Sequence, residues 1–409
     1  MFKRPFFKLT KPRFRYSILT DEPSVHEISL PEEAIFLLEK EHIRRAELQS
    51  YLGKRLITGQ LLRLQEKDFI SPVTGVVTKL DEYIGYLNKQ FYAIHVKVEQ
   101  DEWASIPEDY RPSMLPGLKN VEIIFGFHPP INHVIVMGVD SDLLVTTNQF
   151  CLLTRIEDVK KGIEFINKKA KIGKISFVIF PDFVSYIKEK IDCEYYLIKP
   201  KYPSSIPQLI LKDVLKKFLP AGKKPEDLGI AFISTEAVAN MGAFFEKNYV
   251  FDKIITFINK DYSTVHIKAR VGTPIRHILK ELDVEVNEGD RIVIGGPMRG
   301  YTIHSLDTPV DYETDAIFVQ DAKEIIFSSD THCINCGECV KVCPVNVPVN
   351  MLVRLLENAL FEEAAKEYDL LSCIECGLCS YVCIARIPVF HYIMLGKYEL
   401  SRMGEENAR

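Results

Sequence analysis

Eight of the ten cysteines stand in two short runs late in the chain. The first run begins at residue 333 and reads CINCGECVKVCP, and the second begins at residue 373 and reads CIECGLCSYVCI. Both have the spacing CxxCxxCxxxC, formed by Cys333, Cys336, Cys339 and Cys343 in the first run and by Cys373, Cys376, Cys379 and Cys383 in the second. Thiols at this density can form disulfides, bind zinc or hold iron–sulfur clusters.

The spacing and the rest of the chain separate these three chemistries. A disulfide-stapled secreted domain is usually short and follows a signal peptide, whereas this chain has 409 residues and starts with MFKRPFFKLTKPRFRYSIL, which contains no continuous apolar segment. A zinc site takes its ligands from two separated pairs and has no use for the third cysteine of each run. The pattern CxxCxxCxxxCP is that of two-cluster bacterial ferredoxins, so the runs predict two [4Fe–4S] clusters.

The same ferredoxin pattern predicts which cysteines act together, because the fourth cysteine of each run ligates the other cluster. We expect cluster 1 on Cys333, Cys336, Cys339 and Cys383, and cluster 2 on Cys343, Cys373, Cys376 and Cys379. Gly337 and Gly377 follow the second cysteine of their runs, where a side chain would crowd the turn. No catalytic residue is predicted.

Length and composition set the class of protein. With 409 residues, 47% of them hydrophobic and 26% charged, the chain is expected to fold into roughly two to four globular domains. The formal net charge of −5 disfavours general binding to nucleic acid. Because no apolar stretch reaches about 18 residues, we expect no membrane span, and the free thiols indicate a reducing compartment.

Basic and aromatic side chains are interleaved in the first sixteen residues. The cations are Lys3, Arg4, Lys8, Lys11, Arg13 and Arg15, and the aromatic residues are Phe2, Phe6, Phe7, Phe14 and Tyr16. Two interpretations remain open. The segment is an arm that wraps its own domain, or it is a strip that docks on a partner or on anionic lipid.

The segment from residue 56 to residue 102 reads as short strands separated by turns. Its SPVTGVV stretch, with Pro72 and Gly75, resembles the barrel-sandwich fold of biotinyl and lipoyl carriers. Those carriers present a lysine at a hairpin tip, but Lys67 lacks that context, so we expect the fold without the carrier function. Residues 1–112 are therefore assigned to the basic arm and a barrel-sandwich domain.

Residues 113–260 alternate between strand and helix patterns. Strands are expected at 133–139, 175–180, 194–200 and 228–234, and helices at 156–171, 181–191, 206–219 and 235–248, the last after a cap at Thr235. This alternation predicts a Rossmann-like α/β domain with a parallel sheet and crossover helices.

Residues 261–325 and 326–409 complete the chain. A single helix between strands in the first of these segments suggests a β-grasp (SLBB-like) domain, and its IGGPMRG motif is a tight core turn or a contact to a partner or ligand. The second segment is expected to be an α-helical dicluster ferredoxin domain. Between its runs, residues 350–371 predict a helical linker with one apolar face formed by Leu352, Leu355, Leu356 and Leu360.

This order of units resembles the C subunit of the Rnf electron-transport complex over nearly the whole chain. The resemblance rests on KYPSSIPQLILKDVL, IGGPMRG and the two cysteine runs. It implies a peripheral subunit on the cytoplasmic face of the cell membrane, in a complex that moves electrons from NADH and flavin through two [4Fe–4S] clusters toward ferredoxin, coupled to ion movement. The α/β part is similar to the NADH- and flavin-binding subunit of respiratory complex I.

Two motifs of that family are missing. Its glycine-rich GxGGAGFPT stretch corresponds here to a segment with Gly117 and Gly126 but no glycine cluster, and its NxxECEP patch leaves only Asp140 and Asp142. We therefore expect an electron-transfer subunit without its own FMN or NADH site, whose electron partner is a ferredoxin, a flavoprotein or a cytochrome. The alternatives are an NADH-oxidising flavin-dependent subunit and a soluble ferredoxin-like carrier.

Overall fold

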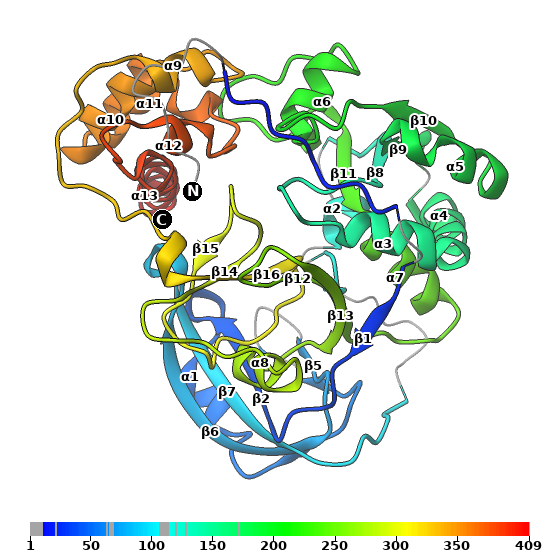
Figure 1. The fold of residues 1–409 in the computed structure, drawn as a ribbon. Helices are drawn as coiled ribbons and strands as arrows, with labels where there is room; N and C mark the ends of the chain where they lie inside the picture. Colours follow the sequence, from blue (N-terminus) through cyan, green and yellow to red (C-terminus); the bar gives the residue numbers. More distant parts are fainter. Residues whose placement is uncertain are drawn as a thin grey trace.

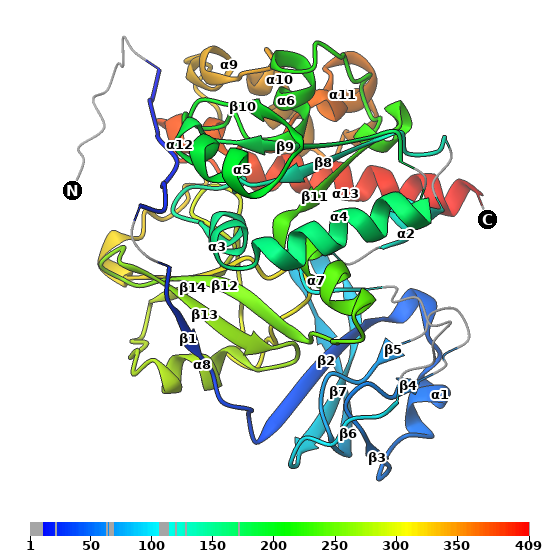
Figure 2. The ribbon, with the colours of Figure 1, turned by 90° about the vertical axis from the view of Figure 1, so that its right-hand side faces the viewer.

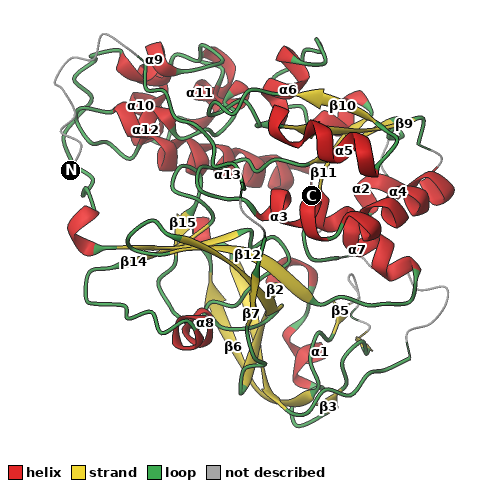
Figure 3. Cartoon of the chain, turned by 45° about the vertical axis from the view of Figure 1, so that its right-hand side comes forward, coloured by secondary structure: helices red, strands yellow, loops and turns green. Residues whose placement is uncertain are grey.

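The computed structural model describes residues 11–20, 23–62, 64, 69–105, 114–118, 121–126, 129–170 and 172–408. The chain forms mixed α/β regions with several sheets, followed by a C-terminal region that is helical in its described part (Figures 1 and 3). We call the part before residue 326 the body. Lys67 and the basic residues Lys3, Arg4 and Lys8 lie outside the described residues.

The N-terminal part of the body contains an antiparallel sheet with the strand order β2-β7-β6-β3. Its strands are β2 (Glu33–Glu39), β3 (Arg55–Leu56), β6 (Gly75–Ile84) and β7 (Gln90–Val98). A short pair, β4 (Leu61–Leu62) and β5 (Phe69–Ile70), and the small helices η1 (Lys40–His42), α1 (Arg45–Gln49) and η2 (Tyr86–Asn88) complete it. Short strands separated by turns were expected in the middle of this region.

The second sheet is parallel, with the order β10-β9-β8-β11, which confirms the parallel sheet expected from the alternating pattern. Its strands are β8 (His133–Met137), β9 (Lys174–Ile179), β10 (Glu194–Leu197) and β11 (Ile230–Ser234). Its helices are α2 (Glu122–Phe125), α3 (Thr147–Thr154), α4 (Ile156–Ala170), η3 (Pro181–Phe183), α5 (Val184–Lys190), α6 (Pro207–Asp213), η4 (Pro225–Leu228) and α7 (Thr235–Phe245).

Two local expectations for this sheet need correction. Helix α6 ends at Asp213 instead of residue 219, and the chain takes a positive φ of 55° at Lys216. The cap of α7 is Ser234, whose hydroxyl accepts a hydrogen bond from the amide of Ala237. The hydroxyl of Thr235 is buried and donates to the carbonyl of Met137, so it is not available as the cap.

The third sheet is mixed and has the order β1-β13-β12-β16-β14-β15. Its strands are β1 (Val25–Glu27), β12 (Asp252–Ile258), β13 (Thr264–Arg270), β14 (Arg291–Ile294), β15 (Tyr301–Thr302) and β16 (Ala316–Gln320), with helices α8 (Ile275–Glu281) and η5 (Ala322–Glu324). Strand β1 lies beside β13, with which it pairs in parallel (Figure 2). The sheet therefore combines strands from three of the predicted domains: β1 from residues 1–112, β12 from residues 113–260, and the other four from residues 261–325.

The C-terminal region, orange to red in Figure 1, consists of helices joined by loops. They are α9 (Glu338–Val342), α10 (Val349–Glu357), α11 (Phe361–Glu367), η6 (Leu370–Ser372), α12 (Leu378–Val382) and α13 (Val389–Ala408). The linker between the runs is thus not one helix. A positive φ of 56° at Ala359 breaks it, and Leu360 is 45% exposed instead of lying on the apolar face.

Residues 11–20 of the basic arm begin beside the C-terminal region and run from there along the body (Figure 1). Tyr16 is buried and its amide donates to the carbonyl of Pro200, while the ring of Phe14 meets that of Tyr381 at 4.8 Å. The cations Lys11, Arg13 and Arg15 are exposed. This described part wraps its own protein with its aromatic side chains and leaves its charges facing outward.

Candidate iron–sulfur centres

The first three thiols of the first run share a cavity with the last thiol of the second run. Cys333, Cys336, Cys339 and Cys383 line this cavity together with Asn350, Val353 and Ile387. Helix α9 starts directly after Gly337, which has a positive φ of 73°, so the turn places Cys339 in the first turn of the helix. The cavity has the thiol set that a cluster with crossed ligation needs.

The second run is arranged in the same way around the last thiol of the first. Burial raises the pKa of Cys373 and raises that of Cys376 to about 11, and the nearby Cys343 thiolate raises both further. Helix α12 starts after Gly377, with a φ of 71°, and places Cys379 in its first turn. Cys383 thus lies with the first three cysteines of the first run, and Cys343 lies near Cys373 and Cys376 of the second.

Five of the eight thiols have a pKa above the ordinary value for cysteine, because they are buried. Burial raises the pKa of Cys339 to about 12 and also raises that of Cys379 and Cys383, with neighbouring thiolates adding to the effect. Because thiolates are the ligands, metal binding must release the protons of these thiols. Among the described residues, no three His, Cys, Asp or Glu side chains are grouped to hold one single metal ion. A [4Fe–4S] cluster does not need such a group, because each of its four cysteines binds a different iron.

The body bonds directly to the loop of the second run. The hydroxyl of Tyr202 donates to the carbonyl of Cys376 over 2.6 Å, and Nε of Arg299 donates to the carbonyl of Glu375 over 3.1 Å. Arg299 belongs to the IGGPMRG motif, which forms the turn between β14 and β15. The motif is therefore a turn that also contacts the second run.

A third donor comes from helix α13. Nζ of Lys397 donates to the carbonyl of Cys373 over 2.6 Å and pairs with the carboxylate of Glu375 over 2.7 Å. We call the side chains of Tyr202, Arg299 and Lys397 the clasp. Sequence reasoning did not single out its members, although Tyr202 lies in the KYPSSIPQLILKDVL motif and Arg299 in the IGGPMRG motif.

Asp140 and Asp142, the two acids that remain from the family's acidic patch, accept hydrogen bonds from backbone amides of this chain. Asp142 accepts hydrogen bonds from the amides of Leu143 and Arg299, both over 2.7 Å, and burial raises its pKa to about 6. Asp140 accepts from the amide of Asn148 over 2.8 Å, and burial raises its pKa to about 7. Both carboxylates are thus already engaged.

The segment that replaces the glycine-rich stretch packs on the start of helix α7. The carbonyl of Gly117 accepts a hydrogen bond from the hydroxyl of Ser234, and that of Pro116 accepts one from the side chain of Asn240, both over 2.8 Å. The first amide of the helix, at Thr235, donates to Asn148 Oδ1 over 3.0 Å. Helix amides that would face a phosphate are therefore bonded to the protein itself.

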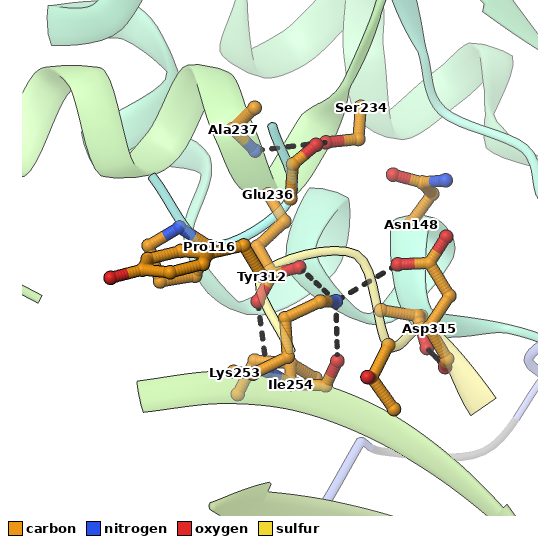
Figure 4. A network of polar contacts seen from close by, with 12 residues as sticks. Pro116, Asn148, Ser234, Glu236, Ala237, Lys253, Ile254, Tyr312 and Asp315 are labelled. Atoms are coloured by element: carbon orange, nitrogen blue, oxygen red, sulfur yellow. Dashed lines mark hydrogen bonds and ion pairs between the residues drawn. The ribbon is translucent and has the colours of Figure 1, made fainter. Parts of the chain in front are cut away.

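A buried ion-pair network lies next to this segment and joins the parallel sheet to the mixed sheet (Figure 4). Nζ of Lys253, on β12, contacts Glu236 over 2.5 Å and Asp315 over 2.9 Å, and also donates to the carbonyl of Ile254. The side chains of Lys253 and Glu236 are 0% and 1% exposed. Removing one partner of such a buried pair typically costs about 3–5 kcal/mol, so the network fixes helix α7 on β12.

A family model described as a 4Fe-4S dicluster domain matches residues 325–384, which contain both runs. Residues 325–384 are therefore similar to a 4Fe–4S dicluster domain. A fold comparison with a chain of an NAD⁺-reducing [NiFe]-hydrogenase gives a TM-score of 0.40 at 9% identity, covering 68% of this chain and 61% of that one, which is too weak to carry an argument.

Curated relatives cover most of the chain. The C subunit of the ion-translocating oxidoreductase complex from Buchnera aphidicola subsp. Acyrthosiphon pisum is 26% identical over 376 residues, covering 83% of this chain and 79% of that protein. The C subunit of the same complex from Pectobacterium atrosepticum is 23% identical over 363 residues. The match covers 80% of this chain and 52% of the Pectobacterium protein. The resemblance to the C subunit of the Rnf complex that the sequence suggested is confirmed.

Proposed function

We propose that this chain is an electron-transfer subunit of a membrane-associated, Rnf-like redox complex and passes electrons through two [4Fe–4S] clusters. The homologues indicate an electron-transport subunit of an ion-translocating oxidoreductase complex. The observation that carries the proposal is the doubled cysteine run, with Cys383 of the second run lining the cavity of the first. When bound, such clusters supply one-electron redox chemistry.

The placement of the cysteines supports crossed ligand sets for the two clusters. Cluster 1 takes Cys333, Cys336, Cys339 and Cys383, and cluster 2 takes Cys343, Cys373, Cys376 and Cys379. The shared cavity supports the first set, and the influence of Cys343 on the thiols of Cys373 and Cys376 supports the second. The buried thiols exclude water and give up their protons as iron binds.

The body is an assembly of supporting domains in this proposal. Residues 1–112 are the arm and barrel-sandwich domain, 113–260 the Rossmann-like domain, 261–325 the β-grasp (SLBB-like) domain, and 326–409 the dicluster ferredoxin domain. The antiparallel, parallel and mixed sheets support these assignments, although β1 and β12 link neighbouring units. Their combined size, far beyond what two clusters need, supports a docking role over that of a free carrier.

The chain is proposed to work without its own FMN or NADH. Asp140 and Asp142 are bonded to the chain's own amides, and the amide of Thr235 at the start of α7 is bonded to Asn148. These contacts support the proposed absence of a phosphate-bearing cofactor at the start of α7. The runner-up function, an NADH-oxidising flavin-dependent subunit, has no comparable support from these contacts.

Attachment to the membrane is proposed to be peripheral, through partner subunits on the cytoplasmic side. Among the described helices, none is both long and apolar enough to cross a membrane. The loop of the first run faces outward, with Ile334 60% exposed, which supports its facing the next electron carrier. That carrier is a ferredoxin, a flavoprotein or a cytochrome.

One purification tests the proposal. The tagged full-length chain is isolated anaerobically from native membranes in mild detergent, and its partners, iron and flavin are measured. We expect co-purifying redox subunits, about eight irons per chain, absorbance bleached by dithionite, and no flavin on the separated chain. Two zinc ions without iron would contradict the cluster assignment. Stoichiometric FMN would restore the dehydrogenase function, and a partner-free chain in the soluble fraction would favour the free carrier.

A further inference from the structure

The loops of the two runs have nearly the same sequence but different surroundings. Each reads C-I-x-C-G-x-C, with Ile334 in the first and Ile374 at the same position in the second. Ile334 is 60% exposed, whereas Ile374 is 4% exposed and packs into the hydrophobic core that surrounds the parallel sheet. A cluster held by the second run is therefore embedded against the body, while one held by the first lies near the surface.

Burial of this kind works against reduction of a cluster. An all-cysteine [4Fe–4S] site carries net negative charge, and the electron adds to it, so loss of solvent destabilises the reduced state. If nothing compensated for this effect, cluster 2 would be harder to reduce than cluster 1. Electrons would then not pass readily between the two.

The clasp supplies the compensation at three neighbouring carbonyls of the second-run loop. Lys397, Arg299 and Tyr202 donate to the carbonyls of residues 373, 375 and 376, over 2.6, 3.1 and 2.6 Å. Among the side chains that the structure describes, none donates a hydrogen bond to the corresponding carbonyls of residues 333, 335 and 336 in the first run. Lys341, in helix α9 of the first run, pairs with Glu338 over 2.9 Å, and its side chain is 67% exposed.

The position of the Arg299 charge is fixed before any cluster binds. Its Nη1 donates to the hydroxyl of Ser141 over 2.8 Å, and its backbone amide donates to Asp142 over 2.7 Å. The amide of Met298 also donates to Asp142, over 3.1 Å. The turn and its guanidinium are thus held by several bonds, which makes Arg299 a preorganised charge.

Two cations and two acids lie at the loop, and the cations are the charged groups that bond its carbonyls. Arg299 and Lys397 are the two cations, and Glu375, which pairs with Lys397 over 2.7 Å, is the acid of the loop itself. The other acid in contact is Asp142, whose carboxylate is met by backbone amides. Partly buried charges are screened little by salt, so their field reaches the cluster.

We propose that Tyr202, Arg299 and Lys397 are positioning residues that raise the reduction potential of cluster 2, offsetting its burial so that it exchanges electrons with cluster 1. The inference rests on the proposed function, because it requires both clusters. It assigns to the IGGPMRG motif the role of presenting Arg299 to the second run. Hydrogen bonds and net charge are among the established means of tuning such potentials.

The experiment is a redox titration of the full-length chain with both clusters, followed by EPR. Lys397→Met and Arg299→Met remove one cation each and keep an unbranched side chain. We expect each variant to lower the midpoint potential of one cluster and to leave that of the other unchanged. The expected decrease corresponds to a tenfold or greater change in the ratio of reduced to oxidised cluster, which is about 59 mV for one electron. Lys397→Arg and Arg299→Lys should restore most of the shift, and Tyr202→Phe should produce a smaller shift in the same direction.

Lys341→Met is the matched control, because it removes an exposed cation beside the first run, and neither potential should move. Unshifted potentials in both methionine variants, equal shifts of both clusters, or a control shift as large as that of Lys397→Met would overturn the inference. If cluster 2 fails to assemble in Lys397→Met or in Arg299→Met, the potential of the other methionine variant and that of Tyr202→Phe decide. A wild-type chain without two clusters would overturn the proposed function as well, whereas two clusters with unshifted variants would overturn this inference alone.

Discussion

The first and second runs present the same ligands in different settings. Gly337 of the first run has no neighbouring atom within 4 Å of an added Cβ, whereas a Cβ on Gly377 of the second would lie 2.2 Å from the carbonyl oxygen of Met298. The same contrast separates exposed Ile334 from buried Ile374. The repeat thus duplicates the metal-binding loop without duplicating what surrounds it.

The difference arises because the neighbours of the second run come from distant parts of the chain. Phe14 of the arm packs on Tyr381, Tyr202 follows strand β10, and Met298 lies in the turn after β14. None of these segments has a counterpart beside the first run in the described structure. A local duplication therefore yields two sites that the body makes unequal, one enclosed and one open to a partner.

The largest expected effect comes from replacing the fourth cysteine of either run by serine. Cys343→Ser should remove the cluster built on the second run, and Cys383→Ser the cluster built on the first, because the fourth cysteine crosses over. Each variant should keep about half of the iron, and EPR potentiometry should show that a different cluster survives in each. Loss of the first-run cluster in Cys343→Ser would show that the ligation is not crossed.

The second-largest expected effect is a difference in stability between alanine variants of the two corresponding glycines, Gly337 and Gly377. Both have a positive φ, 73° at Gly337 and 71° at Gly377, so alanine introduces backbone strain of about 1–2 kcal/mol at either position. At Gly377 the new Cβ also collides with the Met298 carbonyl, which adds about 1–3 kcal/mol of overpacking. We expect Gly377→Ala to lower the free energy of unfolding clearly more than Gly337→Ala, measured by urea denaturation of the holo protein. Equal losses would mean that the turn does not press on the second run.

The sequence predicted the ligands and the parallel sheet because both have local signals. Cysteine spacing is read directly, and strands such as the one from 133 to 137 are short apolar runs between helices. The clasp had no such signal, since Arg299 and the carbonyl it contacts at Glu375 are separated by 76 residues. Likewise, nothing local marks Lys253 as a lysine that is fully buried between two acids.

Errors in the expected elements have local backbone causes. The linker between the runs has good helical periodicity, yet a left-handed residue at Ala359 divides it and turns Leu360 outward. Alanine is a strong helix former, so propensity alone could not reveal this break. Strand β12 was not separated from the preceding α/β pattern, because its place in the mixed sheet depends on pairing with β13 and β16.

The smallest expected effect comes from the paired isoleucines. Ile374→Val removes one methylene from a side chain in the core around the parallel sheet and should cost about 0.5–1.5 kcal/mol. Ile334→Val makes the same chemical change at an exposed position and should stay within about 0.5 kcal/mol of the wild type. The measurement is urea unfolding of both holo variants, with iron content checked first so that cluster loss does not enter the comparison. If Ile334→Val costs as much as Ile374→Val, the first-run loop is enclosed in solution, and the open site inferred from its exposure does not exist.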